Sequence, residues 1–364
     1  MTDQPYPGPA GPPAGDTWAP PPDRAPGQPP GQPPIQSWSP PREHSFPHAE
    51  PTPYHLMLRT WTYEPWRVVV GVILCVGGFF VVTALVYLVV AGVAAVVEGG
   101  NWLDNFMASA DMTDVKPATL LGLNLALGSM ILVCWFVERV LHNLRPRWLT
   151  SVVPKMRWKF FSVCLGLSVV ALLAQVLVGS LLPGGDGAGV GGKLNDFTTS
   201  TAVTAVVVLL TTPLQAAGEE YLFRGYLLQA VGALSRNRWV AVGVTGTLFA
   251  LAHGAQNFPL FFDRLAFGLI AAWLVTATGG LEAGIALHVL NNFLAFGLAL
   301  SFGDLSETLT VSEASWWNII LTITQSAVYA ALVLWVARRM GLQTRTRPPA
   351  AEPGATASPD LATA

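Results

Sequence analysis

The sequence predicts an all-α protein, a polytopic integral membrane bundle with about eight transmembrane helices. Composition, the length of the apolar segments and the placement of charge between them support this prediction. Of the 364 residues, 52% are hydrophobic and 12% are charged, and the mean hydropathy is +0.46. Ordinary soluble domains contain about 25% charged residues, so this chain has too little charge to cover a water-soluble surface.

Eight apolar segments are long enough, or nearly so, to cross about 30 Å of hydrocarbon, which takes about 20 helical residues. The first is overlong and is expected to tilt or project, and the fifth and sixth are short and contain glycine. The segments cover approximately residues 68–97, 119–137, 160–182, 202–223, 239–254, 264–279, 283–303 and 316–337.

Charge alternates between the loops that join these segments. With both tails counted on the inner side, 17 of the 20 basic residues fall on that side, and the exceptions are Lys116, Lys193 and Arg264. Acidic residues occupy the other loops. By the positive-inside rule this pattern predicts an even number of spans, with both termini cytoplasmic in a multi-pass plasma-membrane protein.

Both ends of the chain are expected to be disordered tails. Residues 1–58 form a Pro-rich cytoplasmic tail that leans toward polyproline II, and 18 of the 29 prolines lie within its first 53 positions. A solvated spacer or a PxxP ligand both fit this composition, and no partner is identified by it. Residues 344–364 are again rich in Pro, Ala and Thr.

Other partner classes receive no support from the composition. The formal net charge of −2 gives no basic field, so we expect no nucleic-acid partner. Cys75, Cys134 and Cys164 lie in apolar runs without a metal-ligand spacing, and we interpret them as small core residues. The expected partners are the lipid bilayer and a protein or peptide substrate.

Ionisable residues inside a membrane are expensive, by at least about 2.5–3.5 kcal/mol on insertion scales, and therefore indicate function. They are confined to the second half of the chain, on three consecutive polar-bearing segments. The fourth segment carries two adjacent glutamates and an arginine, the fifth ends in a histidine, and the seventh carries a histidine and an amide. The residues are Glu219, Glu220, Arg224, His253, His288 and Asn292.

Helical spacing relates these residues to one another. Glu220 and Arg224 are separated by four positions and can form an ion pair, while Glu219 projects about 100° away. Phe249 and His253, and likewise His288 and Asn292, have the same spacing. We expect the three helices to converge on one intramembrane cavity. Separately, each feature has a structural interpretation, as a topological pair or as interhelical hydrogen bonding.

These groups suit amide hydrolysis. A desolvated glutamate can act as a general base, and imidazole or amide N–H groups can stabilise an oxyanion. Alternatively, Glu219, His253 and His288 could bind a divalent metal such as Zn²⁺ and leave one position for water. The sequence leaves this cofactor question open. It contains no HExxH and no GxSxG motif.

Three motifs in order resemble the CPBP family, the Abi or CAAX-prenyl-protease-2-like intramembrane proteases. They read EExxxR from Glu219 to Arg224, FxxxH from Phe249 to His253, and HxxxN from His288 to Asn292. The similarity covers about residues 200–300, so we divide the membrane region into N-terminal transmembrane helices (59–199), a CPBP-type catalytic core (200–303) and a last transmembrane helix (304–343).

The resemblance implies roles for the motif residues. Glu219 is then the water-activating base, His253 helps to hold the water, and His288 and Asn292 stabilise the oxyanion. Glu220, Arg224 and Phe249 orient the site. Family members process CAAX proteins or bacteriocin-type peptides and are often labelled metalloproteases. Lys-poor, Arg-rich usage indicates a GC-rich bacterial genome, whose cell need not contain prenylated substrates.

Two other functions fit a membrane bundle with these residues. One is a non-catalytic membrane immunity or scaffold protein, and the other is a proton-coupled transporter, which would favour repeated halves. The topology also contains a conflict. Arg224 is expected at the inner boundary and places Glu219 near the cytoplasmic side, whereas His253 falls toward the opposite end of a short span. We therefore expect either a later start for that span or a re-entrant segment at 254–264.

Overall fold

The computed structural model describes residues 46–97, 99–183 and 193–347, and within these ranges the chain is helical. No strand occurs in the described ranges, where the only β pairing consists of two isolated bridges, Pro53 with Arg345 and Ser151 with Gly280. The all-α prediction is confirmed. Such a fold is the one that satisfies every backbone hydrogen bond inside a membrane without a closed barrel.

The helices follow one another with short connections. Two 3₁₀ turns, η1 and η2, and one π-helical segment, η3, interrupt the α-helices. In chain order the elements are η1 (Tyr54–Leu56), α1 (Pro65–Val97), α2 (Trp102–Ala110), α3 (Pro117–Gly128), α4 (Met130–Leu141), η2 (Pro146–Leu149), α5 (Trp158–Leu181), α6 (Thr199–Glu220), η3 (Tyr221–Leu227), α7 (Leu228–Ser235), α8 (Arg238–Leu251), α9 (Phe258–Thr278), α10 (Glu282–Phe302), α11 (Leu305–Leu309) and α12 (Trp317–Arg339).

Seven helical stretches in the described residues are long and apolar enough to cross a membrane. They correspond to seven of the eight predicted segments, and the chain is a multi-pass membrane protein. The eighth segment is α8, which is apolar but has only 14 residues. At 1.5 Å per residue it is about 21 Å long, which is shorter than the hydrocarbon core of about 30 Å.

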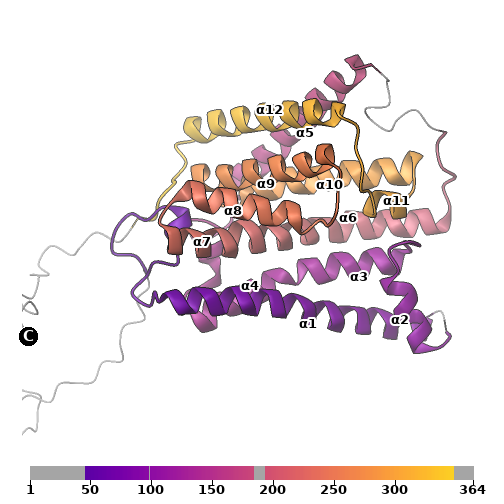
Figure 1. Cartoon of the computed structure of the whole chain (residues 1–364), viewed down its shortest axis with the longest axis horizontal. Helices are drawn as coiled ribbons and strands as arrows, with labels where there is room; N and C mark the ends of the chain where they lie inside the picture. The colour runs from indigo at the N-terminus through magenta and orange to yellow at the C-terminus, as the bar shows by residue number, and fades with distance from the viewer. Residues whose placement is uncertain (1–45, 98, 184–192, 348–364) are drawn as a thin grey trace, which may run out of the picture. The chain divides into compact units, whose positions relative to one another are not determined.

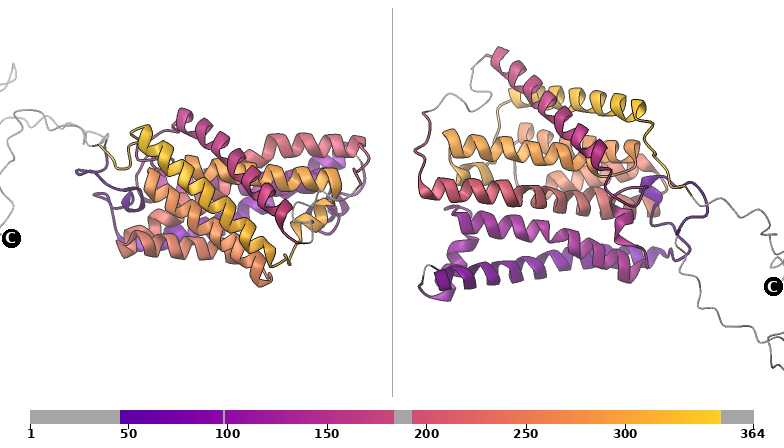
Figure 2. Two further views of the ribbon diagram at one scale, coloured as in Figure 1. Left: turned by 90° about the horizontal axis from the view of Figure 1, so that it is seen from above. Right: turned by 180° about the vertical axis from the view of Figure 1, so that it is seen from behind.

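The helices pack in three layers (Figures 1 and 2). On one side lie α1, α3 and α4, in the middle lie α6 to α10, and on the other side α5 crosses α12. The middle layer is therefore covered on both faces, and α10 contacts α5, α6 and α9 within the bundle. Polar side chains of α6 and α10 that face each other in this layer are therefore buried, among them Glu220 and His288.

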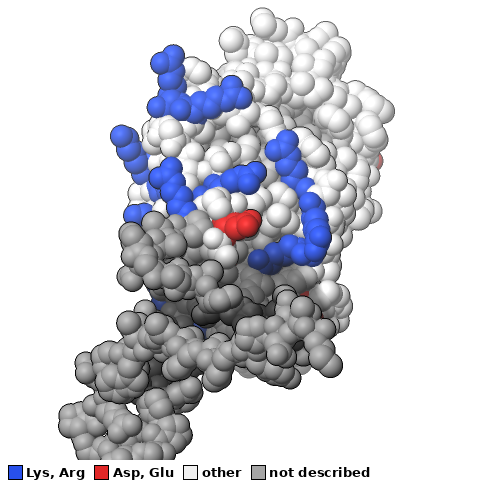
Figure 3. Space-filling view, turned by 90° about the vertical axis from the view of Figure 1, so that its left-hand side faces the viewer, with Lys and Arg blue, Asp and Glu red and all other residues white. Residues whose placement is uncertain are grey.

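Basic and acidic connections occupy opposite ends of the bundle. The loops that join α4 to α5 and α7 to α8 meet the segment after α12 at one end, and Figure 3 shows Lys and Arg side chains gathered on that end. The short helices α2 and α11, with Asp104 and Glu307 in their first turns, lie at the other end (Figure 1). The loops that alternate in charge along the sequence therefore lie at opposite ends of the bundle, basic loops at one end and acidic ones at the other.

The predicted tail boundaries are too far inside the chain. Positions up to 45 and beyond 347 lie outside the described residues, but residues 46–58 pack against the bundle, with Tyr54 and Met57 fully buried. The Tyr54 hydroxyl donates to the Leu149 carbonyl, and Thr52 exchanges hydrogen bonds with Thr346. Aromatic and aliphatic side chains in this stretch therefore outweigh its proline content.

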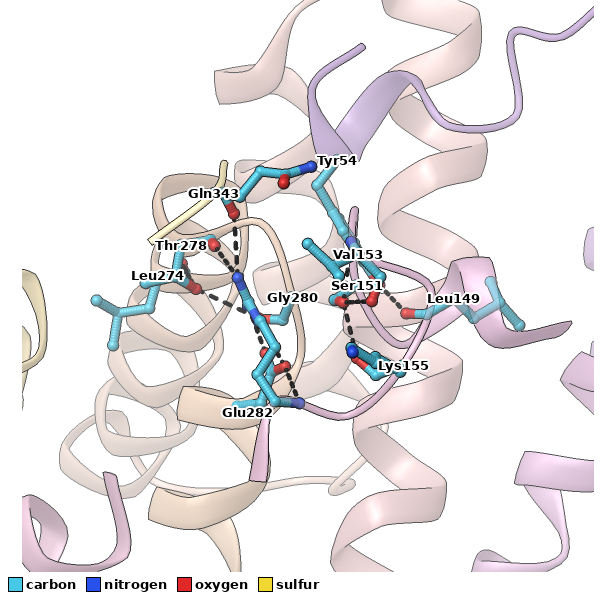
Figure 4. A network of polar contacts seen from close by, with 11 residues as sticks. Tyr54, Leu149, Ser151, Val153, Lys155, Leu274, Thr278, Gly280, Glu282 and Gln343 are labelled. Carbon is cyan, nitrogen blue, oxygen red and sulfur yellow. Dashed lines mark hydrogen bonds and ion pairs between the residues drawn. The ribbon is translucent and has the colours of Figure 1, made fainter. Parts of the chain in front are cut away.

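A buried ion pair holds the basic end together (Figure 4). Nε and Nη2 of Arg157 donate to the two carboxylate oxygens of Glu282 at 2.7 and 2.6 Å, and Nη1 donates to the carbonyls of Thr278 and Gln343. The start of α5, the turn between α9 and α10 and the C-terminal segment are joined through one guanidinium group.

Small residues allow α6 to approach α3 closely. A Cβ atom on Gly218 would overlap the Leu127 carbonyl oxygen, and one on Gly128 would lie 2.6 Å from Leu214 Cγ. Small residues permit this type of close crossing between membrane helices. The contact fixes α6 directly beside Glu219, and the π-helical segment η3 follows at once, an irregularity that is often found at functional sites.

Candidate active site

The seven predicted site residues come from three parts of the middle layer. The end of α6 and the segment η3 supply the acidic pair and the arginine, α8 and the loop after it supply the FxxxH motif, and α10 supplies the HxxxN motif. α10 packs against α6, and α8 packs against both η3 and α9. The helices that carry the three motifs are therefore neighbours in space, as the sequence predicts.

Glu220 is the centre of a buried polar cluster. Its Oε1 accepts a hydrogen bond from Arg224 Nη1 at 2.8 Å and lies 2.9 Å from His288 Nδ1. Glu220 and Arg224 are both 0% exposed. The ion pair expected from the four-residue spacing is present, and the helical stretch continues beyond Arg224 through η3 and α7 to Ser235.

The contact with Glu220 orients the imidazole of His288. A carboxylate can only accept, so Nδ1 of His288 carries the proton in this hydrogen bond. Its other nitrogen, Nε2, lies 3.7 Å from Glu219 Oε2. That distance is too long for a direct hydrogen bond, and a single water molecule placed beside both atoms can contact each of them.

Glu219 is held on one side and open on the other. Its Oε1 accepts a hydrogen bond from Gln215 Nε2 at 2.7 Å, while Oε2 has no hydrogen-bond partner among the described residues. The residue is only 9% exposed. A buried carboxylate oxygen without a partner is costly in a packed protein, which makes Oε2 the atom most available for chemistry.

Phe249 packs at the centre of an aromatic enclosure. The guanidinium carbon of Arg224 lies 4.0 Å from the centroid of the Phe249 ring and 5.2 Å from that of Phe267. The same Phe249 ring contacts the imidazoles of His253 and His288, with centroid distances of 4.6 and 6.0 Å. Cation–π contacts of this kind stabilise a desolvated guanidinium, so Phe249 supports the orientation of all three groups.

His253 lies in the loop after α8 and is exposed at the protein surface. Its Nδ1 lies 2.8 Å from the Phe249 carbonyl oxygen. α8 begins at Arg238, so the predicted later start of that span is not found, and α9 begins at Phe258, so the second part of 254–264 is helical.

Asn292 contacts the cluster through a residue that the sequence motifs do not include. Its Nδ2 donates to Gln215 Oε1 at 2.8 Å, so Gln215 bridges Asn292 and Glu219. Sequence reasoning missed Gln215, although its position four residues before Glu219 puts it on the same helix face. It also missed Phe267 and Gly284, and a Cβ on Gly284 would lie 2.6 Å from Glu220 Oε2.

The side chains do not fit the three-ligand zinc site considered from the sequence. Within the described ranges, no group of three or more His, Cys, Asp or Glu side chains is arranged to hold a metal ion. Nδ1 of His288 is engaged by Glu220, and Nδ1 of His253 by the Phe249 carbonyl. These two contacts leave the Nε2 atoms available and are of the kind that orient metal-bound histidines, so the misfit rests on the placement of the side chains alone.

Comparison with known proteins identifies the same part of the chain. Residues 200–294 match the family described as "Type II CAAX prenyl endopeptidase Rce1-like", and all seven predicted site residues fall within this range. A Bacillus subtilis (strain 168) protein, "Uncharacterized protein YyaK", is 28% identical over 155 residues, which cover 39% of this chain.

The matches cover part of each protein. The chain spans 52% of the length of the Bacillus relative, and no solved structure matches. The description of the matched family names a CAAX prenyl endopeptidase, and the match covers only these residues of the chain. The resemblance predicted from the three motifs is confirmed as a match to the Rce1-like family over residues 200–294.

Proposed function

We propose that the protein is an intramembrane endopeptidase that hydrolyses peptide bonds of membrane-associated proteins or peptides by means of a water molecule activated by Glu219. The observation that carries this proposal is the buried, unpartnered Oε2 of Glu219, which lies 3.7 Å from His288 Nε2. A water molecule between these atoms would have a base on one side and an imidazole on the other.

In the proposed reaction Glu219 removes a proton from the water as its oxygen attacks the peptide carbonyl carbon. A carbon–oxygen bond forms and the carbonyl oxygen becomes an oxyanion. As the tetrahedral intermediate collapses, the carbon–nitrogen bond breaks, and Glu219 returns the proton to the leaving amine nitrogen. The side chains carry this chemistry alone, and no step depends on a metal.

His288 is proposed to stabilise the oxyanion. Because Nδ1 donates to Glu220, Nε2 can donate to the substrate only when the imidazole carries both protons. Glu220 accepts the hydrogen bond from His288 Nδ1 and is itself held by a hydrogen bond from Arg224, so the imidazole keeps a fixed orientation. The positioning role of Glu220 and Arg224 follows from these two contacts.

His253 and Asn292 are proposed to complete the site. His253 lies next to Phe249 and is exposed, so it is suited to receive the substrate and to hold the incoming water. Asn292 donates one N–H to Gln215, and its amide has a second N–H for the oxyanion. Both assignments follow the family motifs and can be tested by substitution.

Purified protein in detergent or vesicles provides the direct test. The probe is an internally quenched, farnesylated peptide that ends in a CAAX sequence, together with an unprenylated control peptide. We expect Glu219→Gln, which keeps the shape of the side chain but removes the base, to lose at least about 100-fold in kcat. Undiminished cleavage by Glu219→Gln would contradict the mechanism.

A cellular comparison addresses the natural substrate. Protein C-termini in cells that express the wild type are compared by proteomics with those in cells that express Glu219→Gln, and new C-termini are expected only with the wild type. A scaffold or immunity protein would give no difference between the two strains while its phenotype persisted. A proton-coupled transporter would instead lose substrate uptake in the variant.

We further propose that the basic end of the bundle, and with it both termini, faces the cytoplasm of a plasma membrane. The separation of basic and acidic loops supports this orientation. Reporter fusions at the loop between Arg145 and Arg157 and at α11 are expected to report cytoplasmic and external locations, respectively. The reverse result would contradict the orientation while leaving the proposed chemistry intact.

A further inference from the structure

We propose that Gln215 is a positioning residue for hydrolysis: its amide fixes the Glu219 carboxylate so that one oxygen faces the reacting water. The residue lies outside the three family motifs. The inference rests on the proposed function, because it takes Glu219 as the base. It assigns to Gln215 no contact with the substrate, only an action through Glu219.

Gln215 contacts two proposed catalytic residues at once. Its Nε2 donates to Glu219 Oε1 at 2.7 Å, and its Oε1 accepts from Asn292 Nδ2 at 2.8 Å. The direction of the amide follows from chemistry. A carboxylate can only accept, so the NH₂ group must face Glu219 and the carbonyl must face Asn292. Both ends of the amide are thus committed, and the side chain is only 6% exposed.

The two hydrogen bonds decide which oxygen of Glu219 remains available. With Oε1 bound to Gln215, Oε2 is the oxygen that lies 3.7 Å from His288 Nε2. Without this contact the carboxylate could rotate about its terminal bond and direct either oxygen elsewhere. The same amide ties α6 to α10 through Asn292, so the base and the oxyanion donor are held in register by one side chain.

A purely structural role for Gln215 is the competing interpretation, and the bundle contains a matched control for it. Gln325 on α12 is 7% exposed, and its Nε2 donates to Asn291 Oδ1 on α10 at 3.0 Å. It therefore joins two helices with a buried amide in the same way. None of its recorded hydrogen bonds reaches a proposed catalytic group, so loss of its amide tests interhelical bonding alone.

The experiment compares Gln215→Met with Gln325→Met, using the purified protein and the farnesylated CAAX peptide. Methionine has a similar length but makes no hydrogen bond of comparable strength. We expect Gln215→Met to lower kcat by about 10- to 100-fold with KM within about threefold, since misplacement of a catalytic group by about 1 Å costs on that scale. Gln325→Met is expected to keep kcat within about threefold, with a similar apparent melting temperature.

A second variant covers the case in which Gln215→Met fails to fold. Gln215→Glu keeps the volume, but the new carboxyl can donate to Glu219 only when it is protonated. We expect its kcat, relative to the wild type at the same pH, to recover as the pH is lowered. A merely structural role gives no such recovery, so its absence overturns the proposal.

The outcomes separate this inference from the proposed function. Wild-type kcat in Gln215→Met, or an equal loss in Gln325→Met, overturns the positioning role while leaving Glu219 as the base. Wild-type cleavage in Glu219→Gln overturns the proposed function itself. In the double variant Gln215→Met with Glu219→Gln, the two losses are expected to be non-additive, because one residue acts through the other.

Discussion

Two buried arginine–glutamate pairs in this bundle differ in how completely their hydrogen bonds are satisfied. Arg157 and Glu282 meet through two parallel hydrogen bonds, and the backbone N–H of Arg157 also donates to the carboxylate. Arg224 and Glu220 meet through one. Nε and Nη2 of Arg224 and Oε2 of Glu220 have no hydrogen-bond partner within the part of the chain that the structure describes.

The difference separates a structural pair from one that is available for chemistry. The hydrogen-bonding groups of Arg157 and Glu282 are engaged with each other and with the backbone, so none is left to bind a substrate. Because the two residues are 125 positions apart in the sequence, their ion pair connects distant segments of the chain. The pair in the site keeps unpartnered polar atoms at a cost in stability. Such a cost is expected where polar groups are kept for a substrate or a water molecule.

The largest expected effect is a loss of folding stability when the Arg157–Glu282 ion pair is broken. Arg157→Met leaves the fully buried Glu282 carboxylate without its counter-ion, and breaking a buried pair on one side costs about 3–5 kcal/mol. We expect a marked fall in the apparent melting temperature of the purified protein, with cleavage lost only in proportion to folded protein. An unchanged melting temperature would show that the Arg157–Glu282 ion pair does not stabilise the fold.

Replacing both members of each pair sharpens the comparison. The double variants are Arg157→Met with Glu282→Leu, and Arg224→Met with Glu220→Leu. Since apolar replacement of a whole buried pair is often neutral for stability, we expect both proteins to fold. Only the second is expected to lose at least about 100-fold in kcat, equivalent to about 2.7 kcal/mol. Equal activities in a cleavage assay would remove the functional distinction between the pairs.

A smaller effect is expected at the contact between Glu220 and α10. In Gly284→Ala the new methyl group would lie 2.6 Å from Glu220 Oε2, and the carboxylate cannot move without weakening its bonds to Arg224 and His288. Overpacking of this kind costs about 1–3 kcal/mol, and we expect about a tenfold fall in kcat from the displaced carboxylate.

The control for this substitution lies on the same helix. At Gly297 an added Cβ has no atom within 4 Å, and alanine favours a helix over glycine by about 1 kcal/mol. Gly297→Ala is therefore expected to be neutral or slightly stabilising, with wild-type kcat. If Gly284→Ala and Gly297→Ala behave alike, the close approach of Glu220 to α10 is not important for the site.

The sequence predicts the Glu220–Arg224 ion pair but not the Arg157–Glu282 ion pair, and the difference has a physical reason. Apolar segments longer than about 15 residues form helices almost irrespective of detail in a membrane, so all eight segments recur as helices. Contacts four residues apart follow from helix geometry, and the Glu220–Arg224 pair was accessible in this way. The Arg157–Glu282 pair was not, because helix periodicity carries no information about which distant loops meet.

Within the site the sequence located the charged groups and the residues of the three motifs but missed Gln215. Glu219 and His288 stand out in apolar segments because charge is costly there. Gln215 is an uncharged amide, a residue type that is common between membrane helices, so composition alone does not distinguish it. The π-helical segment η3 was also beyond the sequence, since it depends on how neighbouring helices pack.

The smallest expected effect concerns a histidine that, unlike His288, has no carboxylate partner among the described residues. His142, just after α4, is 2% exposed, and its Nε2 lies 2.9 Å from the Tyr226 hydroxyl. Burial, assisted by the positive charge of Arg67, lowers the pKa of His142 to about 4. The unfolded chain, with an ordinary pKa near 6.5, therefore binds more protons than the folded protein between these values, and stability is lost as the pH falls through this window.

Between about pH 7.5 and about pH 5.5 the loss attributable to His142 is about 1 kcal/mol. We expect the apparent melting temperature of the wild type to fall over this interval, and that of His142→Gln, which does not titrate there, to fall less. Glu219→Gln, which alters the site, is expected to follow the wild type. If His142→Gln retains the full pH dependence, the acid sensitivity of the fold originates elsewhere, and the imidazoles of the active site become the next groups to substitute.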